Sequence, residues 1–277
     1  MGKFFNITVK PTILASQLAT VYGSGDVVFD WHAVDIPKGA AKLLGVTAIM
    51  RQKHGTAANE QPFDLVYAKS INKTAPGSLG TGNATADGTG YYNNVIGKTT
   101  FIAKDYMSDI LDNGVTIAAT SQGGADSDSV DMVLQCEPDS GTNVGYDKLY
   151  VGMICQGAFD FTTAAVTSQA IDVSGLSAAQ LVNADIEGTD PRLVFAPGDV
   201  LHAQDDIIIG EIESMADANT ITFKADGSTT TSETSYTVPA NLAAWVTQNG
   251  ADAAGDLGSG DELINVNPIK IILHFEK

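Results

Sequence analysis

Short apolar runs recur along the whole chain, and they constrain the fold more than any other feature of the sequence. The runs are about five to nine residues long and are separated by Gly, Asn, Asp, Ser and Pro. In the run 63–69, for example, Phe63, Leu65 and Tyr67 share one face, because side chains alternate along a strand. This pattern is typical of antiparallel β proteins and predicts an all-β fold.

The runs predict strands in two groups. The first group is 26–31, 43–51, 63–69, 99–103, 115–119, 130–136, 148–157 and 158–161, and the second is 205–214, 219–225, 233–238 and 268–276. Eight strands before residue 165 favour a jelly-roll-like antiparallel β-sandwich over residues 1–165. The later strands predict a small β-barrel or sandwich domain over residues 166–277, closed by the run at 268–276.

Helical spacing is rare in this sequence. Three short helices are predicted, at 104–114, 176–184 and 239–249, from apolar residues spaced three or four apart. Two stretches rich in Gly, Thr, Asn and Ser, 71–94 and 225–235, are predicted as long surface loops or a hairpin tip.

The charge of the chain is strongly negative and unevenly distributed. Its formal net charge is −18, with −5 on residues 1–165 and −13 on residues 166–277. Such a balance argues against nucleic-acid binding, which needs clustered Lys and Arg. We interpret the excess as a solvated acidic surface; a dedicated site for a cation or a basic partner is the alternative.

Membrane and export signals are missing from the sequence. No run approaches the roughly 18 apolar residues of a membrane helix, and the start MGKFFNITVKP has no apolar stretch of signal-peptide length. We therefore expect no membrane partner and synthesis in a cytoplasm. Cys136 and Cys155 alternate with apolar neighbours, which predicts buried free thiols; a disulfide between them is the alternative if their strands are adjacent.

No motif for catalysis is found. The four histidines, His32, His54, His202 and His274, lie in unrelated contexts, and the sequence contains neither a nucleophile elbow nor a phosphate-binding loop. No zinc-type spacing of His or Cys is present either. We therefore predict no catalytic residues, no cofactor-binding residues and no enzyme activity.

Acidic residues supply the best candidates for a ligand site. Asp126, Asp128 and Asp131 in the segment 123–131 offer oxygens to calcium, but the Gly and Glu of a calcium loop are missing, so a solvated turn is preferred and no metal is predicted. Two pairs have the composition of glycosidase carboxylates, Asp205 with Asp206 and Asp261 with Glu262. Without an aromatic sugar platform nearby, we interpret both pairs as turn and strand-edge charges.

Several segments resemble virion structural proteins of marine tailed phages, notably the myoviruses that infect cyanobacteria. They are DWHAVDIPKGAAKLLGVTAIMR (30–51), EPDSGTNVGYDKLYVGMICQGAFDF (137–161), PGDVLHAQDDIIIGEIES (197–214) and NPIKIILHFEK (267–277). The resemblance implies a β-rich particle component present in many copies, without catalytic residues. It does not distinguish the head from the tail.

These observations together favour a capsid decoration or cement protein of a bacteriophage. Such a protein is made in the host cytoplasm, is located in the virion, binds the major capsid protein or other virion proteins, and forms a homo-oligomer, here expected to be a trimer. The alternative is a tail, baseplate or fibre component with a glycan-binding face. A particle-borne enzyme that degrades polysaccharides is the third hypothesis.

Overall fold

The computed structural model confirms the all-β prediction. It describes residues 3–18, 20–51, 60–107, 115–120, 130, 132–139, 146–161, 180–182, 195–203, 208–217, 220–224, 229–230, 237–238 and 263–277. Strands contain 57% of these described residues and helices 4%. Short alternating runs separated by turn residues therefore form antiparallel sheets, as expected from their period.

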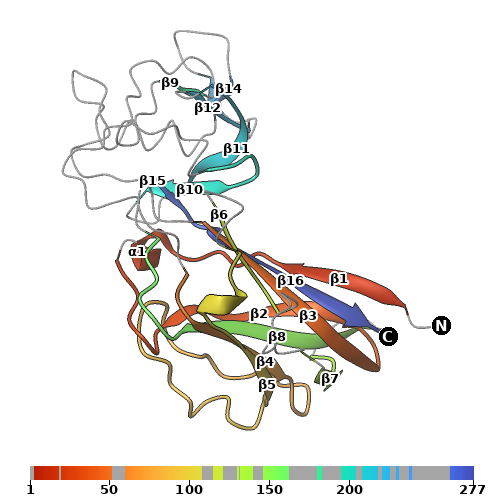
Figure 1. Cartoon of the computed structure of the whole chain (residues 1–277). Coiled ribbons are helices and arrows are strands. Elements are labelled where there is room, and N and C mark those ends of the chain that lie inside the picture. The colour runs from red at the N-terminus through yellow and green to blue at the C-terminus, as the bar shows by residue number, and fades with distance from the viewer. Residues whose placement is uncertain are drawn as a thin grey trace.

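Two antiparallel sheets form a sandwich (Figure 1). The first, here the β1 sheet, has the order β1 (Phe4–Val9), β16 (Ile269–Glu276), β3 (Ala40–Arg51) and β6 (Val115–Ala119), with β7 (Met132–Gln135) paired to the start of β3. The second, here the β2 sheet, has the order β2 (Val27–Pro37), β8 (Tyr146–Cys155), β4 (Phe63–Lys69) and β5 (Val95–Phe101). Each sheet thus combines strands from distant parts of the chain.

The strand order has a regular relation to the chain order. The strands of the sandwich can be numbered from 1 to 8 in chain order when β6 and β7 are counted as one strand, because both pair with β3. In these numbers β8 is strand 7 and β16 is strand 8. The β1 sheet then has the order 1-8-3-6 and the β2 sheet the order 2-7-4-5. The first and last strands are therefore neighbours, and the two chain ends lie together at one end of the sandwich (Figure 1).

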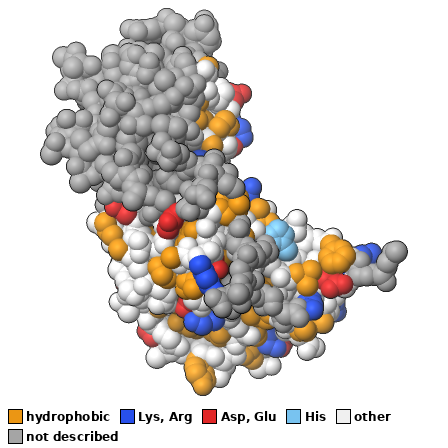
Figure 2. Space-filling view, viewed as in Figure 1, with side chains coloured by type: hydrophobic (Ala, Val, Ile, Leu, Met, Phe, Trp, Pro, Cys, Tyr) orange, Lys and Arg blue, Asp and Glu red, His pale blue; other side chains and the backbone are white. Residues whose placement is uncertain are grey.

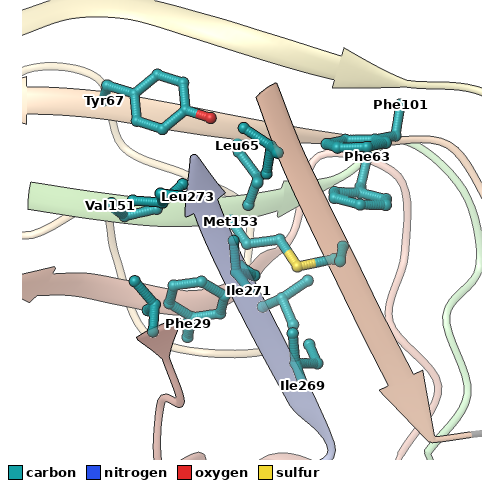
Figure 3. Close-up of a cluster of buried hydrophobic side chains, with 14 of the residues drawn as sticks. Phe29, Phe63, Leu65, Tyr67, Phe101, Val151, Met153, Ile269, Ile271 and Leu273 are labelled. Atoms are coloured by element: carbon teal, nitrogen blue, oxygen red, sulfur yellow. The ribbon is translucent and has the colours of Figure 1, made fainter. Parts of the chain in front are cut away.

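The hydrophobic core lies between the two sheets. Side chains of β2, β4, β8 and β16 point toward one another in Figure 3, and Phe63 stacks on Phe101 with ring centroids 4.6 Å apart. The alternating residues Ile269, Ile271 and Leu273 are fully buried, because β16 places every second side chain in the core. The removal of these apolar side chains from water stabilises the packing of the two sheets against each other.

The C-terminal strand corrects the predicted organisation. We predicted that the run 268–276 closes a second domain, but β16 pairs along its length with β3 and with β1. That assignment is wrong because alternation identifies a strand without revealing its partner. The eighth strand of the sandwich is β16, whereas the predicted eighth strand, 158–161, is irregular and contributes Phe159 and Phe161 to the core.

Residues 162–265, here the inserted region, separate β8 from β16. The described part contains a sheet with the order β15 (Leu263–Asn265), β10 (Val200–Ala203), β11 (Ile208–Asp217), β12 (Thr220–Phe223) and β9 (Gln180–Val182), and a hairpin of β13 (Thr229–Thr230) and β14 (Thr237–Val238). A separate second domain remains a prediction for this part of the chain. The predicted loop at 225–235 includes β13, and its remaining residues lie outside the described ranges.

Two of the helix predictions are wrong where the structure describes them. The segment 104–114 begins in a 3₁₀ turn, η1 (Ala103–Asp105), after which Tyr106 bridges to Ala118, and 176–184 contains strand β9. The helix predicted at 239–249 lies outside the described residues. The α-helix of the described ranges is the short α1 (Ala15–Leu18), and no helix there is long and apolar enough to cross a membrane.

Candidate functional site

A long loop covers the outer face of the β2 sheet. This covering loop, residues 70–94, includes the predicted surface loop 71–94, and it contains isolated bridges and turns instead of a named strand. Asp30 of β2 anchors it, since its carboxylate accepts hydrogen bonds from the Leu79 amide at 2.7 Å and the Ser78 hydroxyl at 2.6 Å. One strand residue therefore fixes the position of the loop.

Leu79 is the apolar anchor of the covering loop. Its side chain is fully buried, although it does not belong to the main core between the sheets. The Leu79 side chain occupies the space above Gly152 of β8, where a Cβ atom would lie 2.2 Å from Leu79 Cδ1 and 3.3 Å from the Trp31 ring. A glycine at this point of the sheet lets the loop approach closely.

We expect Gly152→Ala to destabilise the fold by about 1–3 kcal/mol, because the new methyl group overpacks a buried site. Urea unfolding measures the loss. Gly88→Ala is the matched control, since its Cβ would meet its nearest atom, Tyr91 Oη, only at 3.9 Å. Equal unfolding midpoints for the two variants would show that the loop is not packed on β8.

A second set of hydrogen bonds ties the loop to the segment before β2. Asn83 adopts a left-handed backbone conformation with φ of 57°. Its side-chain amide donates to the carbonyl oxygens of Gln17 and Thr20 at 2.9 and 3.0 Å. Asparagine combines tolerance of this backbone region with a polar side chain, so it suits the turn and the anchor together.

A cleft lies between the covering loop and the segment 11–17. It has a volume of about 370 Å³. The lining includes Asp30, Trp31, His32, Gln17 and the backbone of 80–82. The size and the mixture of an aromatic ring with polar groups are those of a small-ligand site.

The aromatic side of this cleft is held in place. Trp31 Nε1 donates to the Gly77 carbonyl at 2.7 Å, and the Tyr91 ring meets the indole edge-on at 5.4 Å. Burial lowers the pKa of His32, so its imidazole is neutral at pH 7. Burial, and then the charges of Asp87 and Asp30, raise the pKa of Tyr91. The cleft therefore presents the Asp30 carboxylate and a neutral imidazole beside a fixed indole.

Tyr92 is the most exposed large apolar side chain of the described residues. Its exposed fraction is 82%, and Val95 at the start of β5 is 37% exposed. Sequence reasoning missed both Tyr92 and Trp31, although the doubled tyrosine in GYYNN stands out within a Gly- and Asn-rich loop. Single exposed hydrophobic residues are common on protein surfaces, but tyrosine is enriched among the residues that dominate binding energy, which makes Tyr92 a candidate contact residue.

A second cleft lies where the inserted region meets the sandwich. It has a volume of about 440 Å³ and includes Lys10, Arg51, Asp199 and Lys270. Arg51 Nη2 donates to Asp199 Oδ2 at 3.1 Å, and Lys10 Nζ donates to the Gly198 carbonyl at 2.9 Å. The side chain of Asp199 is only 7% exposed, so this carboxylate is a buried tie between the two parts of the chain.

The cysteines agree with the prediction of buried free thiols. Cys136 and Cys155 are both buried and unbonded to each other. Burial, reinforced by the charge of Asp147, raises the pKa of Cys136 to about 12, and burial raises that of Cys155 to about 11. Both thiols remain protonated at neutral pH and are therefore poor nucleophiles.

The other predicted site residues are dispersed or lie outside the described ranges. His274 bridges Asn6 at 3.0 Å and Thr47 at 3.1 Å on the outer face of the β1 sheet, and His202 lies on β10. The remaining candidates lie outside the described residues: His54, Asp126, Asp128, Asp131, Asp205, Asp206, Asp261 and Glu262. In the part of the chain that the structure describes, no group of three or more His, Cys, Asp or Glu side chains is placed to hold a metal ion.

Comparison with known proteins assigns no family to the chain. No protein-family model and no curated protein matches it. The two clefts and the exposed face of the covering loop are therefore the basis for an inference about function.

Proposed function

We propose that the protein is a non-enzymatic structural component of a bacteriophage virion, and that it decorates the outer surface of the head. In this proposal the sandwich binds the major capsid protein through the face formed by the covering loop. The acidic inserted region projects from the other side of the attachment point or joins a neighbouring contact.

The strand order carries the proposal. The orders 1-8-3-6 and 2-7-4-5 support a jelly-roll assignment, with the inserted region between the seventh and eighth strands. Jelly rolls are common in viral capsid proteins and in lectins. This support is an analogy of fold, because one fold hosts many functions.

The covering loop supplies support that is specific to this chain. Tyr92 is 82% exposed, and the loop beneath it is fixed by Asp30 and by the buried Leu79. An aromatic residue on a rigid support loses little conformational entropy when it binds, which is the usual property of an interface hot spot. The loop is therefore our candidate for the capsid contact.

The charge of the inserted region is consistent with an outward position. Residues 162–265 contain 16 acidic and 2 basic side chains, a net charge of −14, out of −18 for the whole chain. Strongly acidic surfaces remain solvated and resist aggregation. A particle protein present in many copies benefits from such a surface facing solvent.

Tyr92→Ala is expected to weaken binding to heads stripped of this protein by about tenfold or more, because truncation of a central aromatic typically costs about 2 kcal/mol. Co-sedimentation with the stripped heads measures the affinity. Tyr146→Ala is the matched control, since Tyr146 is also exposed but lies at the start of β8, outside the covering loop. Equal affinity of the Tyr92 variant and the wild type, or a wild type that binds tails instead of heads, would contradict the proposal.

One observation favours a glycan-binding tail or fibre component as the second candidate. The cleft beside Trp31 joins an indole ring to Asp30, His32 and Gln17, whereas the sequence had suggested no aromatic sugar platform. A glycan array with the wild type and with Gln17→Ala tests this function. Binding of a sugar that the variant loses would favour the second candidate over head decoration.

A further inference from the structure

The outer edge of β1 is free of backbone partners in the part of the chain that the structure describes. Lys3 and Lys277 exchange both of their backbone hydrogen bonds, at 3.0 and 2.9 Å. Because hydrogen-bonded pairs alternate in an antiparallel ladder, the odd-numbered residues of β1 bond to β16 and the even-numbered ones face outward. The N–H and C=O groups of Phe4, Asn6 and Thr8 therefore point away from the sheet.

The edge strands β2, β5 and β6 of the sandwich are each protected at least in part. The free side of β6 is covered where the Met107 amide bonds to the Ile117 carbonyl, and the start of β2 is covered by hydrogen bonds with Asn83 and Ala84. Strand β5 carries Lys98 and a register shift opposite Tyr67 and Ala68. Charges, bulges and covering segments are the usual means by which proteins block edge pairing.

Strand β1 has none of these protections. Its sequence, FFNITV, contains no charge and no proline, and its register with β16 runs without a shift from Phe4 to Val9. Phe4 is 73% exposed, and Asn6 and Thr8 are exposed as well. In Figure 1 β1 lies along the outer border of the sandwich. Such an edge is a template for another strand.

We propose that β1 pairs with β1 of a second copy of this chain, antiparallel across a two-fold axis at Asn6. Because the outward N–H and C=O groups belong to even-numbered residues, even-numbered residues must pair with each other across the interface. With Asn6 opposite the partner's Asn6, Phe4 lies opposite the partner's Thr8, so all three even-numbered residues of β1 are paired. The same register places Phe5 beside the partner's Ile7, so both faces of the new ladder have apolar contacts. The β1 sheets of the two copies become one continuous sheet.

Charge complementarity supports a second copy of the chain as the partner of β1. The end of the sandwich where β1 begins carries Lys3, Lys38 and Lys277, with Lys277 Nζ donating to the Lys38 carbonyl at 2.9 Å. Figure 2 shows hydrophobic, basic and acidic side chains at this end. The inserted region, with its net charge of −14, joins the sandwich at the other end of β1, beside Lys10. Antiparallel pairing brings the point where each inserted region joins the sandwich toward the partner's lysines, and it sets the two joining points at opposite ends of the paired strands.

The lysine at the end of β1 does not oppose this pairing. Lys10 Nζ is directed to the Gly198 carbonyl, and Asp199 lies 3.7 Å from it. Its charge is therefore drawn toward the inserted region and away from the edge.

The pairing is isologous and yields a dimer, in contrast to the trimer expected from the sequence. The pairing does not depend on where the protein is located in the particle, so its test is independent of the test of head decoration.

Light scattering after size exclusion tests the dimer with the full chain. Because a six-residue ladder is at the low end of interface size, the protein is loaded at about 100 µM. We expect a mass twice the 28.9 kDa of one chain. Phe4→Lys with Thr8→Lys places like charges directly opposite each other, which destabilises a strand pair, and should give the monomer mass.

Phe4→Lys with Thr8→Glu is the register control, because each new lysine then faces a glutamate of the partner, and it should retain the dimer mass. Val95→Lys, on the edge strand β5, should also leave the dimer intact. A monomeric wild type would overturn the proposal. So would a dimer that survives the two-lysine variant, or a charge-swapped variant that dissociates as fully as the two-lysine one.

Discussion

Deletion of residues 268–277 is expected to abolish folding of the entire sandwich. Strand β16 lies between β1 and β3, so its loss removes two ladders from the middle of the β1 sheet. It also removes Ile269, Ile271, Leu273 and Phe275, each at most 1% exposed. Burial of four such side chains contributes about 6–12 kcal/mol, which is comparable to the total stability of a domain.

Far-UV circular dichroism, thermal melting and the soluble fraction after expression measure this loss. A chain that ends at Phe275 is the control, since it retains the four buried side chains and should remain folded. The assignment of the run 268–276 to a second domain predicts, in contrast, that residues 1–165 remain folded after the deletion. A truncated protein with a cooperative melt over residues 1–165 would contradict the pairing of β16 with β1 and β3.

Local alternation was sufficient to find most strands of the sandwich. Strands β4 and β6 have the predicted bounds, β3 begins three residues before the predicted run, and β8 begins and ends two residues before the predicted run. Side chains on these strands face the core and solvent in turn, so the pattern of the buried face is visible in a short window. The fold class could therefore be predicted from the sequence.

Pairing between distant strands could not be predicted in the same way. One partner of β16 is β1, which lies more than 260 residues earlier in the chain. Nothing in the local pattern of either strand identifies the other as its partner. Strand β1 was itself missed, although Phe5, Ile7 and Val9 alternate with the polar Asn6 and Thr8. The run 158–161 was wrongly predicted as a strand, since its phenylalanines fill the core from an irregular segment.

The candidate sites depend on contacts of the same long-range kind. Asp30 and Leu79 are 49 residues apart, and Arg51 and Asp199 are 148 apart. A carboxylate that anchors a loop has the same local sequence context as one that is solvated, so the sequence around Asp30 or Asp199 does not identify the residues that they bind. The covering loop was predicted correctly, but its role in covering the β2 sheet arises from Leu79 and Gly152 meeting in space.

Asp199→Ala is expected to loosen the inserted region from the sandwich by about 2–4 kcal/mol. The Asp199 carboxylate accepts from Arg51 Nη2 at 3.1 Å and from the Ala196 amide at 2.9 Å, and its side chain is 7% exposed. Removal of one member of a buried charged pair is costly, because the other charge remains desolvated without that carboxylate. The value is reduced from that of a fully buried pair because Arg51 is 21% exposed.

Hydrogen exchange distinguishes this effect from a general loss of stability. In the Asp199 variant the amides of β10 and β11 should exchange faster, whereas those of β4 and β8 in the sandwich should keep their protection, because the tie lies outside the main core. Glu211→Ala is the matched control: its ion pair with Lys224 is exposed, and exposed pairs contribute at most about 1 kcal/mol. If both variants changed exchange in β10 and β11 equally, Asp199 would be an ordinary surface charge and the inserted region would be held by its strand pairing alone.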